Sequence, residues 1–306
     1  MESFTAQDSI KIVRLEHFTF RQAVDLWNAG FSGYYSDMTM TIERYIGKLA
    51  RDSIRPDLSV VAVEDGVPAG FVLIAFKSID GVKIAWNGGT GVSPVFRSRG
   101  IAKRLMREAV RVMEEEGACT SLLEVVQKNR NAVAVYESAG FRIADRIIGM
   151  KREGALSPQT YSGPGEREAR GYRIVPAEPW RIAKLPFYRQ EAAWTCQWHN
   201  MAGDDGYVLY DREDCIAAYA LARKKYDDSG KPASITLFQC EADPRREDRK
   251  HLIAAVLETV FGPPDCDWIR QTENLSTADP TAFEWLEAAG FETVYTQFLM
   301  IRERVS

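Results

Sequence analysis

The length, composition and charge of the chain limit its organisation and its partners. Its 306 residues are 45% hydrophobic, which is enough apolar material for two domains of ordinary size. The 39 Lys and Arg residues are outnumbered by 43 Asp and Glu, for a formal net charge of -4. No broad positive field is therefore expected for holding nucleic acid.

Membrane insertion, secretion and metal binding are not expected either. No run approaches the roughly 18 consecutive apolar residues of a spanning helix, and residues 1–14 carry charges where a signal peptide has its apolar stretch. The five cysteines and three histidines are scattered, with neither a CxxC pair nor two His at ligand spacing. We expect a cytoplasmic protein with reduced thiols and no bound metal.

The first half of the chain alternates helices and strands. Its apolar periodicity predicts strands at 11–14, 59–63, 69–76, 82–93, 121–126 and 141–150, and helices at 20–29, 41–50, 101–116 and 131–138. The helix at 101–116 is long enough to bridge two parallel strands. The order indicates a mixed α and β domain.

The second half repeats this plan after a linker. Residues 153–171 are rich in Gly, Pro, Ser and charge and have no helical or strand period, so the domains are expected at 1–152 and 172–306. Strands are predicted at 172–175, 207–210, 215–222, 234–242, 266–271 and 291–301, and helices at 249–260 and 281–289. Residues 287–291, EAAGF, match residues 137–141, ESAGF. A tandem duplication is the expected origin.

Residues 91–102, GVSPVFRSRGIA, combine a strand end, a turn and a helix start. A turn between Pro94 and Gly100 aims backbone N–H groups and the positive end of the helix dipole at one spot. That spot favours a pyrophosphate group. Gly100 permits a close approach to the main chain, and Ala102 is too small to obstruct it. An ordinary strand-to-helix turn uses the same Pro and Gly, so the turn alone leaves both interpretations open.

This segment resembles the acyl-CoA signature of the GNAT family of N-acetyltransferases. In that signature a strand ending in Val-x-Pro is followed by Arg or Gln, two residues, Gly, one residue, and Gly or Ala, and the matching residues here are Val92, Pro94, Arg97, Gly100 and Ala102. A second motif of the family is matched downstream by Asn129, Ala132, Tyr136, Gly140 and Phe141. Two motifs in the family's order and spacing indicate a GNAT domain over about residues 10–150.

The resemblance implies a fold, a cofactor and a set of binding residues. Each of the two tandem GNAT-like domains is expected to have a central mixed, mostly antiparallel sheet flanked by helices. The implied cofactor is acetyl-CoA (coenzyme A), with its pantetheine arm in the gap between two splayed strands. The implied cofactor-binding residues are Val92, Ser93, Arg97, Ser98, Arg99, Gly100, Ile101, Ala102 and Asn129.

Acyl transfer to an amine needs an acid for the leaving thiolate and a base for the amine. Tyr136, where the family places a Tyr near the sulfur, is the expected acid, since a phenol with a pKa of about 10 can protonate a thiolate; alternatively it only packs beside Phe141. Glu124 is the expected base, because a carboxylate in an apolar strand either faces the site or is buried at a cost. Its spacing before Tyr136 also resembles ribosomal-protein N-terminal acetyltransferases, although in many relatives this Glu only bonds main chain.

Two other segments border the expected site. Gly88, Gly89 and Gly91 in one strand indicate a bulge or a close backbone approach. The loop after the first helix contains Phe31, Tyr34 and Tyr35, where the family builds its acceptor pocket. We expect these aromatic residues to bind the substrate; the alternative is that they cover the edge of the core.

The second domain has lost the signature. An ungapped alignment places Glu247 at Arg97, Lys250 at Gly100 and Leu286 at Tyr136, so this copy is expected to be non-catalytic. The predicted function is transfer of an acetyl group from acetyl-CoA to a primary amine of a small molecule or peptide, by direct attack in a ternary complex. The alternatives are a non-catalytic acyl-CoA-binding sensor or scaffold and an acetyltransferase of protein N-termini. A homodimer remains open.

Overall fold

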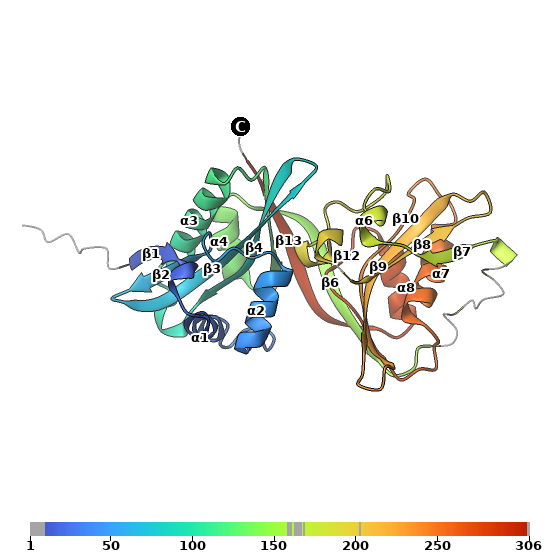
Figure 1. Cartoon of the computed structure of the whole chain (residues 1–306), viewed down its shortest axis with the longest axis horizontal. Helices are drawn as coiled ribbons and strands as arrows, with labels where there is room; N and C mark the ends of the chain where they lie inside the picture. Colours follow the sequence, from blue (N-terminus) through green and yellow to red (C-terminus); the bar gives the residue numbers. More distant parts are fainter. Residues whose placement is uncertain (1–9, 158–160, 162–166, 168, 202, 305–306) are drawn as a thin grey trace, which may run out of the picture. The chain divides into compact units, whose positions relative to one another are not determined.

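The protein consists of two compact units (Figure 1). The computed structural model describes residues 10–157, 161, 167, 169–201 and 203–304. Unit 1 comprises Met1–Ala144 together with Leu299–Ser306, and unit 2 comprises Asp145–Phe298. Residues 158–160, 162–166 and 168 of the predicted linker lie outside the described residues. Residues 299–304 therefore return to the first unit after the whole of the second.

The sheet of unit 1 is mostly antiparallel. Its strands are β1 (Ile10–Arg14), β2 (Val60–Glu64), β3 (Val67–Ile79), β4 (Val82–Val92), β5 (Thr120–Val126) and the end of β13 (Glu292–Glu303), in the order β1-β2-β3-β4-β5-β13. Neighbours from β1 to β4 are antiparallel, whereas β4 and β5 are parallel. The N–H of Arg304 donates to the carbonyl of Cys119 at 2.9 Å, just before β5.

Helices cover both faces of this sheet. They are α1 (Phe20–Gly30), α2 (Ile42–Arg51), α3 (Ile101–Glu115) and α4 (Arg130–Ser138), with the short η1 (Leu15–His17) and η2 (Pro94–Phe96). Neighbouring residues of β4 show which helices share a face: Lys48 of α2 lies over the Trp86 ring, and Asn87 contacts Met106 of α3. Because successive strand residues point to opposite faces, α2 and α3 lie on opposite sides (Figure 1).

Unit 2 has a sheet of the same design. Its strands are β6 (Arg142–Glu153), β11 (Ile269–Thr272), β10 (Pro232–Ala242), β9 (Ile216–Tyr226), β8 (Asp205–Tyr210) and β7 (Arg173–Pro176), in that spatial order, with β12 (Leu275–Ser276) beside β6. Here β10 and β11 are the parallel pair. The helices are α6 (Pro179–Ile182), α7 (Arg249–Phe261) and α8 (Pro280–Ala288), with η4 (Trp194–Cys196) and η5 (Trp198–Asn200).

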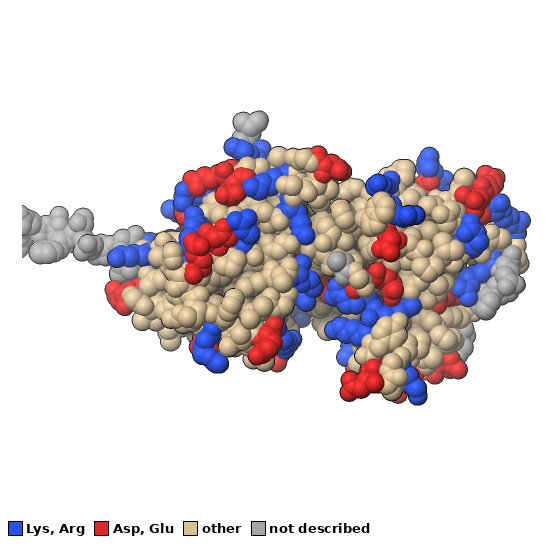
Figure 2. Space-filling model, viewed as in Figure 1, with Lys and Arg blue, Asp and Glu red and all other residues tan. Residues whose placement is uncertain are grey.

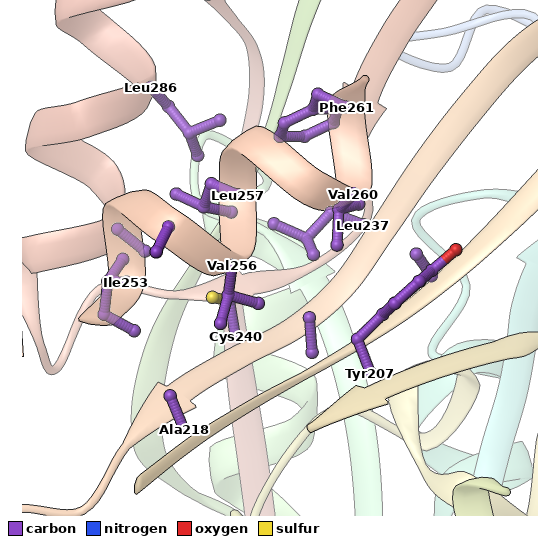
Figure 3. Packing of buried hydrophobic residues seen from close by; sticks show 14 of the residues in the cluster. Tyr207, Ala218, Leu237, Cys240, Ile253, Val256, Leu257, Val260, Phe261 and Leu286 are labelled. Atoms are coloured by element: carbon purple, nitrogen blue, oxygen red, sulfur yellow. The ribbon is translucent and has the colours of Figure 1, made fainter. Parts of the chain in front are cut away.

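The core of unit 2 lies under α7. Val256 and Leu257 of this helix are fully buried against Leu237 of β10 and Leu286 of α8 (Figure 3). Burying one such aliphatic side chain stabilises the fold by about 1.5–3 kcal/mol. The helix therefore fixes the position of the strand to which it is connected.

The structure confirms the predicted mixed α and β class. The predicted helices and strands are present within a few residues of their expected bounds. The unpredicted elements, α6, β12 and the short 3-10 helices, are too brief to show a period in the sequence. Among the described residues, no helix is long and apolar enough to cross a membrane.

Charge is mixed on the visible surface. On the face shown in Figure 2, Lys and Arg side chains alternate with Asp and Glu over each unit. Many of these residues are paired, as Arg111 is with Glu108 and Glu115 on α3. This face therefore has no extended positive patch of the kind that holds polyanions.

Candidate functional site

The parallel strands β4 and β5 pair over only part of their length. Their pairing runs from Ile84 opposite Thr120 to Asn87 opposite Leu123. Within the described residues, which include both strands in full, it ends there, although β4 continues to Val92 and β5 to Val126. Beyond the last pair, β4 and β5 therefore continue without pairing to each other.

A bulge in β4 begins where this pairing ends. Leu73 of β3 lies opposite Gly89, and the next pair joins Ile74 to Asn87, so Gly88 is the extra residue. A Cβ on Gly91 would lie 2.6 Å from the Phe71 ring. The glycine cluster thus makes both a bulge and a close approach, as the sequence predicted.

The predicted phosphate turn follows directly. After η2, Ser98 has a φ of 64° and Gly100 a φ of 77°, which turns the chain sharply into α3. Gly100 is the N-cap, and no side chain in the described part of the protein caps this helix. The N–H groups of Ile101 and Ala102 therefore begin the helix without a side-chain acceptor, as an anion site requires.

The two arginines of the turn have protein partners. Arg97 donates from Nε to the carbonyl of Val92 at 3.0 Å and from Nη2 to the carbonyls of Gly30 and Ser32 at 3.2 and 2.9 Å. Arg99 forms an ion pair with Glu64 at 2.8 Å. Arg97 therefore ties the turn to the end of α1, and the contribution of either side chain to cofactor binding remains a prediction.

Tyr136 projects from α4 toward the bulge. Its side chain is 7% exposed. Burial raises the pKa of Tyr136, and the polar side chains of Thr90 and Asn87 oppose that rise. The ring also packs edge-on against Phe141, with centroids 6.4 Å apart. The structure thus contains the packing contact and, in addition, polar contacts for the hydroxyl.

Glu124 lies on the other face of the sheet. Its Oε2 accepts a hydrogen bond from Trp86 Nε1 at 2.6 Å, and Trp86 is 4% exposed. Lys48 Nζ lies 4.9 Å from the centroid of the same indole ring. This carboxylate is half-buried. Glu124 lies one residue beyond the last pair of β4 with β5, and on the opposite face of the sheet from Tyr136.

The aromatic loop after α1 reaches the end of β5. Phe31, Tyr34 and Tyr35 contact one another in succession, with ring centroids 5.2 and 5.3 Å apart. Tyr35 donates to the carbonyl of Lys128 at 3.3 Å. Burial together with the nearby Tyr136 raises the pKa of Tyr34 to about 12, although the Asn129 side chain opposes this rise.

Asn129 joins this loop to the start of α4. Its Oδ1 accepts from the N–H of Ala132 at 3.2 Å, which makes it the N-cap of the helix. The same side chain is near enough to Tyr34 to lower the pKa of its phenol, against the effect of burial. The structure therefore brings the predicted substrate loop, cofactor residue and acid to the carboxyl end of β5.

Three neighbours of the site were not predicted from the sequence. They are Asn87, Thr90 and Trp86, which contact Tyr136 or Glu124. Asn87 is 5% exposed. The sequence did offer a signal for Asn87: a polar residue in a buried strand needs a partner for its side chain.

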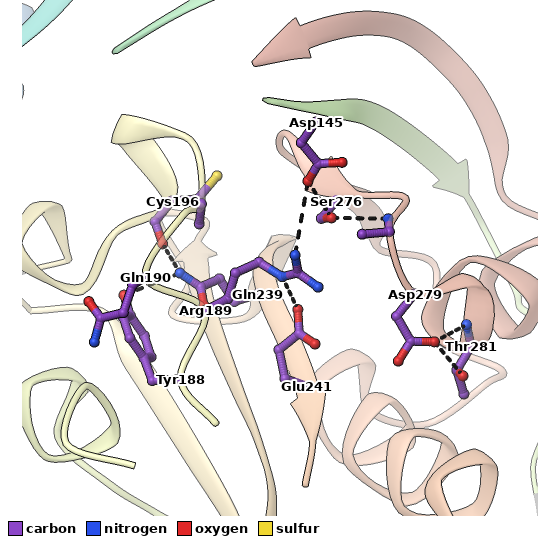
Figure 4. A network of polar contacts seen from close by, with 12 residues as sticks. Asp145, Tyr188, Arg189, Gln190, Cys196, Gln239, Glu241, Ser276, Asp279 and Thr281 are labelled. Carbon is purple, nitrogen blue, oxygen red and sulfur yellow. Dashed lines mark hydrogen bonds and ion pairs between the residues drawn. The ribbon is translucent and has the colours of Figure 1, made fainter. Parts of the chain in front are cut away.

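In unit 2 the corresponding strands diverge in the same way but are bridged by protein. The pairing of β10 with β11 ends at Leu237 opposite Thr272, and a register shift follows between Leu237 and Gln239. Gln239 Nε2 donates to the carbonyl of Cys196 at 2.9 Å (Figure 4). Cys196 Sγ donates to the carbonyl of Glu273 at 3.1 Å. Cys196 is thus hydrogen-bonded to both diverging strands.

The turn of unit 2 also differs from the ungapped alignment. The helix α7 begins after the N-cap Asp248, four residues beyond Pro244, whereas Gly100 lies six residues beyond Pro94. Asp248, and not Lys250, therefore occupies the place of Gly100, because this turn is two residues shorter. The Arg246 guanidinium lowers the pKa of Asp248 to about 2, so a carboxylate stands where an anion would bind.

Comparisons with known proteins agree with this geometry. Residues 20–141 match the model of the Acetyltransferase (GNAT) family. The mycothiol acetyltransferase of Propionibacterium freudenreichii subsp. shermanii is 29% identical over 164 residues, which cover 51% of this chain and 53% of that protein. The match thus spans about half the length of that relative.

Solved structures resemble nearly the whole chain. A tandem GNAT protein from the clavulanic acid biosynthesis pathway covers 97% of this chain and 99% of its own, with 17% identity and a TM-score of 0.61. A GCN5-related N-acetyltransferase from Sphaerobacter thermophilus covers 98% and 97%, with 15% identity and a TM-score of 0.66. A glucosamine N-acetyltransferase region of a fungal multi-domain β-N-acetylglucosaminidase covers 97% and 38%, with 14% identity and a TM-score of 0.69.

At these identities the structural likeness establishes the fold. It extends over both units and includes a tandem GNAT protein. The family match, in turn, covers the diverging strands, the turn and α4 of unit 1. Residues 20–141 of the chain thus match the Acetyltransferase (GNAT) family, and the chain has the fold of a tandem GNAT protein.

Proposed function

We propose that the chain is an acetyl-CoA-dependent N-acetyltransferase whose reaction takes place in unit 1. The observation that carries this proposal is the divergence of β4 and β5 beyond Asn87 and Leu123, next to a helix start without a side-chain cap. An extended ligand arm can lie between the two strands beyond their last pair while its anionic end meets the helix.

The residues of the turn fit the pyrophosphate of CoA. Gly100 presents no Cβ at a positive φ, and the N–H groups of Ile101 and Ala102 follow it. Ser93, Ser98 and Arg99 flank this spot, and Asn129 lies near the far end of the gap. Bound here, acetyl-CoA would supply the activated acetyl group.

Tyr136 and Glu124 are the proposed acid and base. Glu124 takes a proton from the substrate amine, directly or through water, so that the nitrogen lone pair can attack the acetyl carbon. The C–S bond breaks as the C–N bond forms, and Tyr136 gives its proton to the departing thiolate. Their placement on opposite faces of the parted strands suits roles on opposite sides of the reacting carbon.

Unit 2 is proposed to be a non-catalytic copy. Its strand gap is bridged through Cys196, and Asp248 places a negative charge at the start of α7. Leu286 stands where the sequence motif of unit 1 has Tyr136. One molecule of acetyl-CoA per chain is the expected stoichiometry.

The acceptor is proposed to be a primary amine of a small molecule or peptide. The aromatic residues Phe31, Tyr34 and Tyr35 border the site on the acceptor side. The names of two similar proteins, a mycothiol acetyltransferase and a glucosamine N-acetyltransferase region, make amino sugars a sensible first class to test. Short peptides test the alternative of N-terminal acetylation.

The test measures CoA formation by the full chain with acetyl-CoA and a panel of amines. Chromatography is preferable to a thiol reagent, because Cys119 and Cys215 are exposed. We expect turnover with at least one amine and a loss of about 100-fold in kcat for Tyr136→Phe. Tyr188→Phe, which alters a buried tyrosine of unit 2, is the matched control with unchanged kcat.

The rival function is that of a sensor or scaffold that binds acyl-CoA without turnover. The altered turn of unit 2 favours this rival, because a unit of the same fold has already lost the features of a ligand-binding turn. Saturable binding of acetyl-CoA with no CoA formed from any amine, in wild-type protein and Tyr136→Phe alike, would support this rival and overturn the enzyme proposal.

A further inference from the structure

Trp86 of β4 is a hydrogen-bond donor to the Glu124 carboxylate. Its Nε1 lies 2.6 Å from Glu124 Oε2, and Trp86 is 4% exposed. An indole has a single donor and no acceptor, and a buried donor needs a partner. A hydrogen bond to a carboxylate is also shorter and stronger than one between neutral groups. This bond therefore fixes one oxygen of Glu124 relative to β4.

The ring of Trp86 is held from two further directions. On α2, Lys48 Nζ lies 4.9 Å from the centroid of the ring and forms an ion pair with the buried Asp52 at 2.8 Å. A cation over the face of an indole is attracted to it. Gly88 leaves room for the ring, because a Cβ there would lie 2.7 and 3.0 Å from Cζ3 and Cε3 of Trp86. The position of the indole N–H is thus set by α2 and by the extra residue of the bulge.

Unit 2 shows that the fold does not require this donor. In the strand pairing, Thr236 and Glu273 of unit 2 correspond to Trp86 and Glu124, since each Glu lies one residue beyond the last pair. Thr236 Oγ1 accepts from Gln271 Nε2 at 3.0 Å. The unit proposed to be non-catalytic thus has the carboxylate but no indole at the corresponding strand position.

We propose that Trp86 is a positioning residue, which holds the Glu124 carboxylate in the orientation that receives the proton of the substrate amine. The proposal rests on the function proposed above. A carboxylate has about four acceptor positions, so Glu124 can keep the bond to Trp86 and still take a proton. Gly88 contributes indirectly, because it admits the ring that carries the donor. The bulge of β4 thus helps to orient the proposed base.

Replacing Trp86 by benzothienylalanine in the full chain tests the bond itself. This amino acid has the shape of tryptophan with sulfur in place of the N–H, so the packing and the ring face below Lys48 remain. We expect kcat to fall about tenfold while KM for acetyl-CoA changes less than about twofold. The same replacement of Trp194, a buried tryptophan of unit 2, is the matched control with unchanged kcat.

Ordinary substitutions test the part of Gly88. Gly88→Ala places a methyl group against the ring and is expected to lower kcat by at least about tenfold. Trp86→Phe removes the ring atoms that this methyl group would strike, so in that background Gly88→Ala is expected to change kcat less than about twofold. Gly47→Ala, where a Cβ would contact no described atom within 4 Å, is the control that leaves kcat unchanged. Equal losses in both backgrounds would overturn the part assigned to Gly88.

A double-mutant cycle with Glu124→Gln separates positioning from packing. In the Glu124→Gln background, benzothienylalanine at Trp86 is expected to change kcat less than about twofold, because the base that Trp86 positions is gone. An equal loss in both backgrounds, or full activity of the singly replaced protein, overturns the positioning role and leaves the base role of Glu124 intact. Full activity of Glu124→Gln overturns both roles, and no turnover by wild-type protein with any amine overturns the proposed function itself.

Discussion

The parallel strand pairs of the two units part at equivalent places, with different consequences. In unit 1 the pairing of β4 and β5 ends at Asn87 and Leu123, and in unit 2 that of β10 and β11 ends at Leu237 and Thr272. Each end is followed by a register shift against the neighbouring antiparallel strand. Divergence of the strands is therefore a property of the fold, and it does not by itself make a site.

The residues around each gap decide its use. In unit 2, Gln239 accepts from Tyr219 at 2.8 Å and donates to Tyr188 and to the carbonyl of Cys196, at 3.2 and 2.9 Å (Figure 4). These bonds satisfy main-chain and side-chain groups that a ligand would otherwise meet. In unit 1 the equivalent place is Gly89, which has no side chain to offer. In unit 2 protein groups therefore bridge the gap between the strands, whereas in unit 1 no side chain at the equivalent position does so.

Transferring the N-cap of unit 2 into unit 1 should have the largest effect. Gly100→Asp adds a carboxylate at the start of α3 in a conformation that Asp tolerates, as Asp65 and Asp80 do at φ of 49° and 50°. We expect CoA binding to weaken by about 100-fold through repulsion of the pyrophosphate, with thermal stability unchanged or raised.

Calorimetric titration with CoA measures this loss. Gly100→Asn is the matched control, because it has the same size and backbone tolerance without the charge, and we expect it to lose no more than about tenfold. Equal affinities of the Asp variant and wild type would show that the pyrophosphate binds elsewhere.

Removing the proposed base, Glu124, should have the next-largest effect, and a conservative substitution isolates that role. Gln at this position can still accept from Trp86 Nε1, now at 2.6 Å from Glu124 Oε2, so the packing contact survives. We expect Glu124→Gln to lose at least about tenfold in kcat with an unchanged melting temperature. Full activity would show that this carboxylate has a structural role and does not act as the base.

Breaking the bridge in unit 2 should affect stability and leave the reaction alone. Gln239→Leu removes three hydrogen bonds of a buried network, those to Tyr188, Tyr219 and the carbonyl of Cys196, at a cost of about 1–3 kcal/mol in the free energy of unfolding. Chemical denaturation measures the loss, with kcat as the control. A second equivalent of bound CoA in this variant would contradict the view that Asp248 also excludes it.

The pH dependence should be the smallest effect. Burial raises the pKa of Tyr136, so the acid keeps its proton at and beyond the pH of about 10 at which a free phenol ionises. With saturating amine, kcat is therefore expected to change less than about twofold between pH 8 and pH 10. A steep fall within that range would assign the acid role to another group.

The sequence was informative where local rules govern the structure. The turn at 92–102 has the Pro, Gly and small residues that the structure uses, and Gly88, Gly89 and Gly91 indicated the bulge that is observed. Helix and strand positions followed from apolar periodicity, since each element buries one face.

Contacts that depend on distant segments could not be predicted in this way. The bulge shifts the register of β4, so Asn87 and Thr90, three residues apart, reach the same face and meet Met106 of α3. The bridge through Cys196 joins segments more than 40 residues apart in sequence. The shorter turn before α7 could be recognised only from the observed start of that helix, because an ungapped alignment placed Lys250 opposite Gly100.

The return of residues 299–304 to unit 1 gives the protein an order of assembly. Arg302 donates to the carbonyl of Ala139 at 3.2 Å and pairs with Glu114 at 2.5 Å, and Arg304 bonds to Cys119. The ribosome synthesises residues 299–304 only after all of unit 2. Until then, the edge of β5 that pairs with β13 has no partner strand. The unit that contains β4 and β5 is thus completed only after unit 2 has been made, which ties the folding of unit 1 to synthesis of both units.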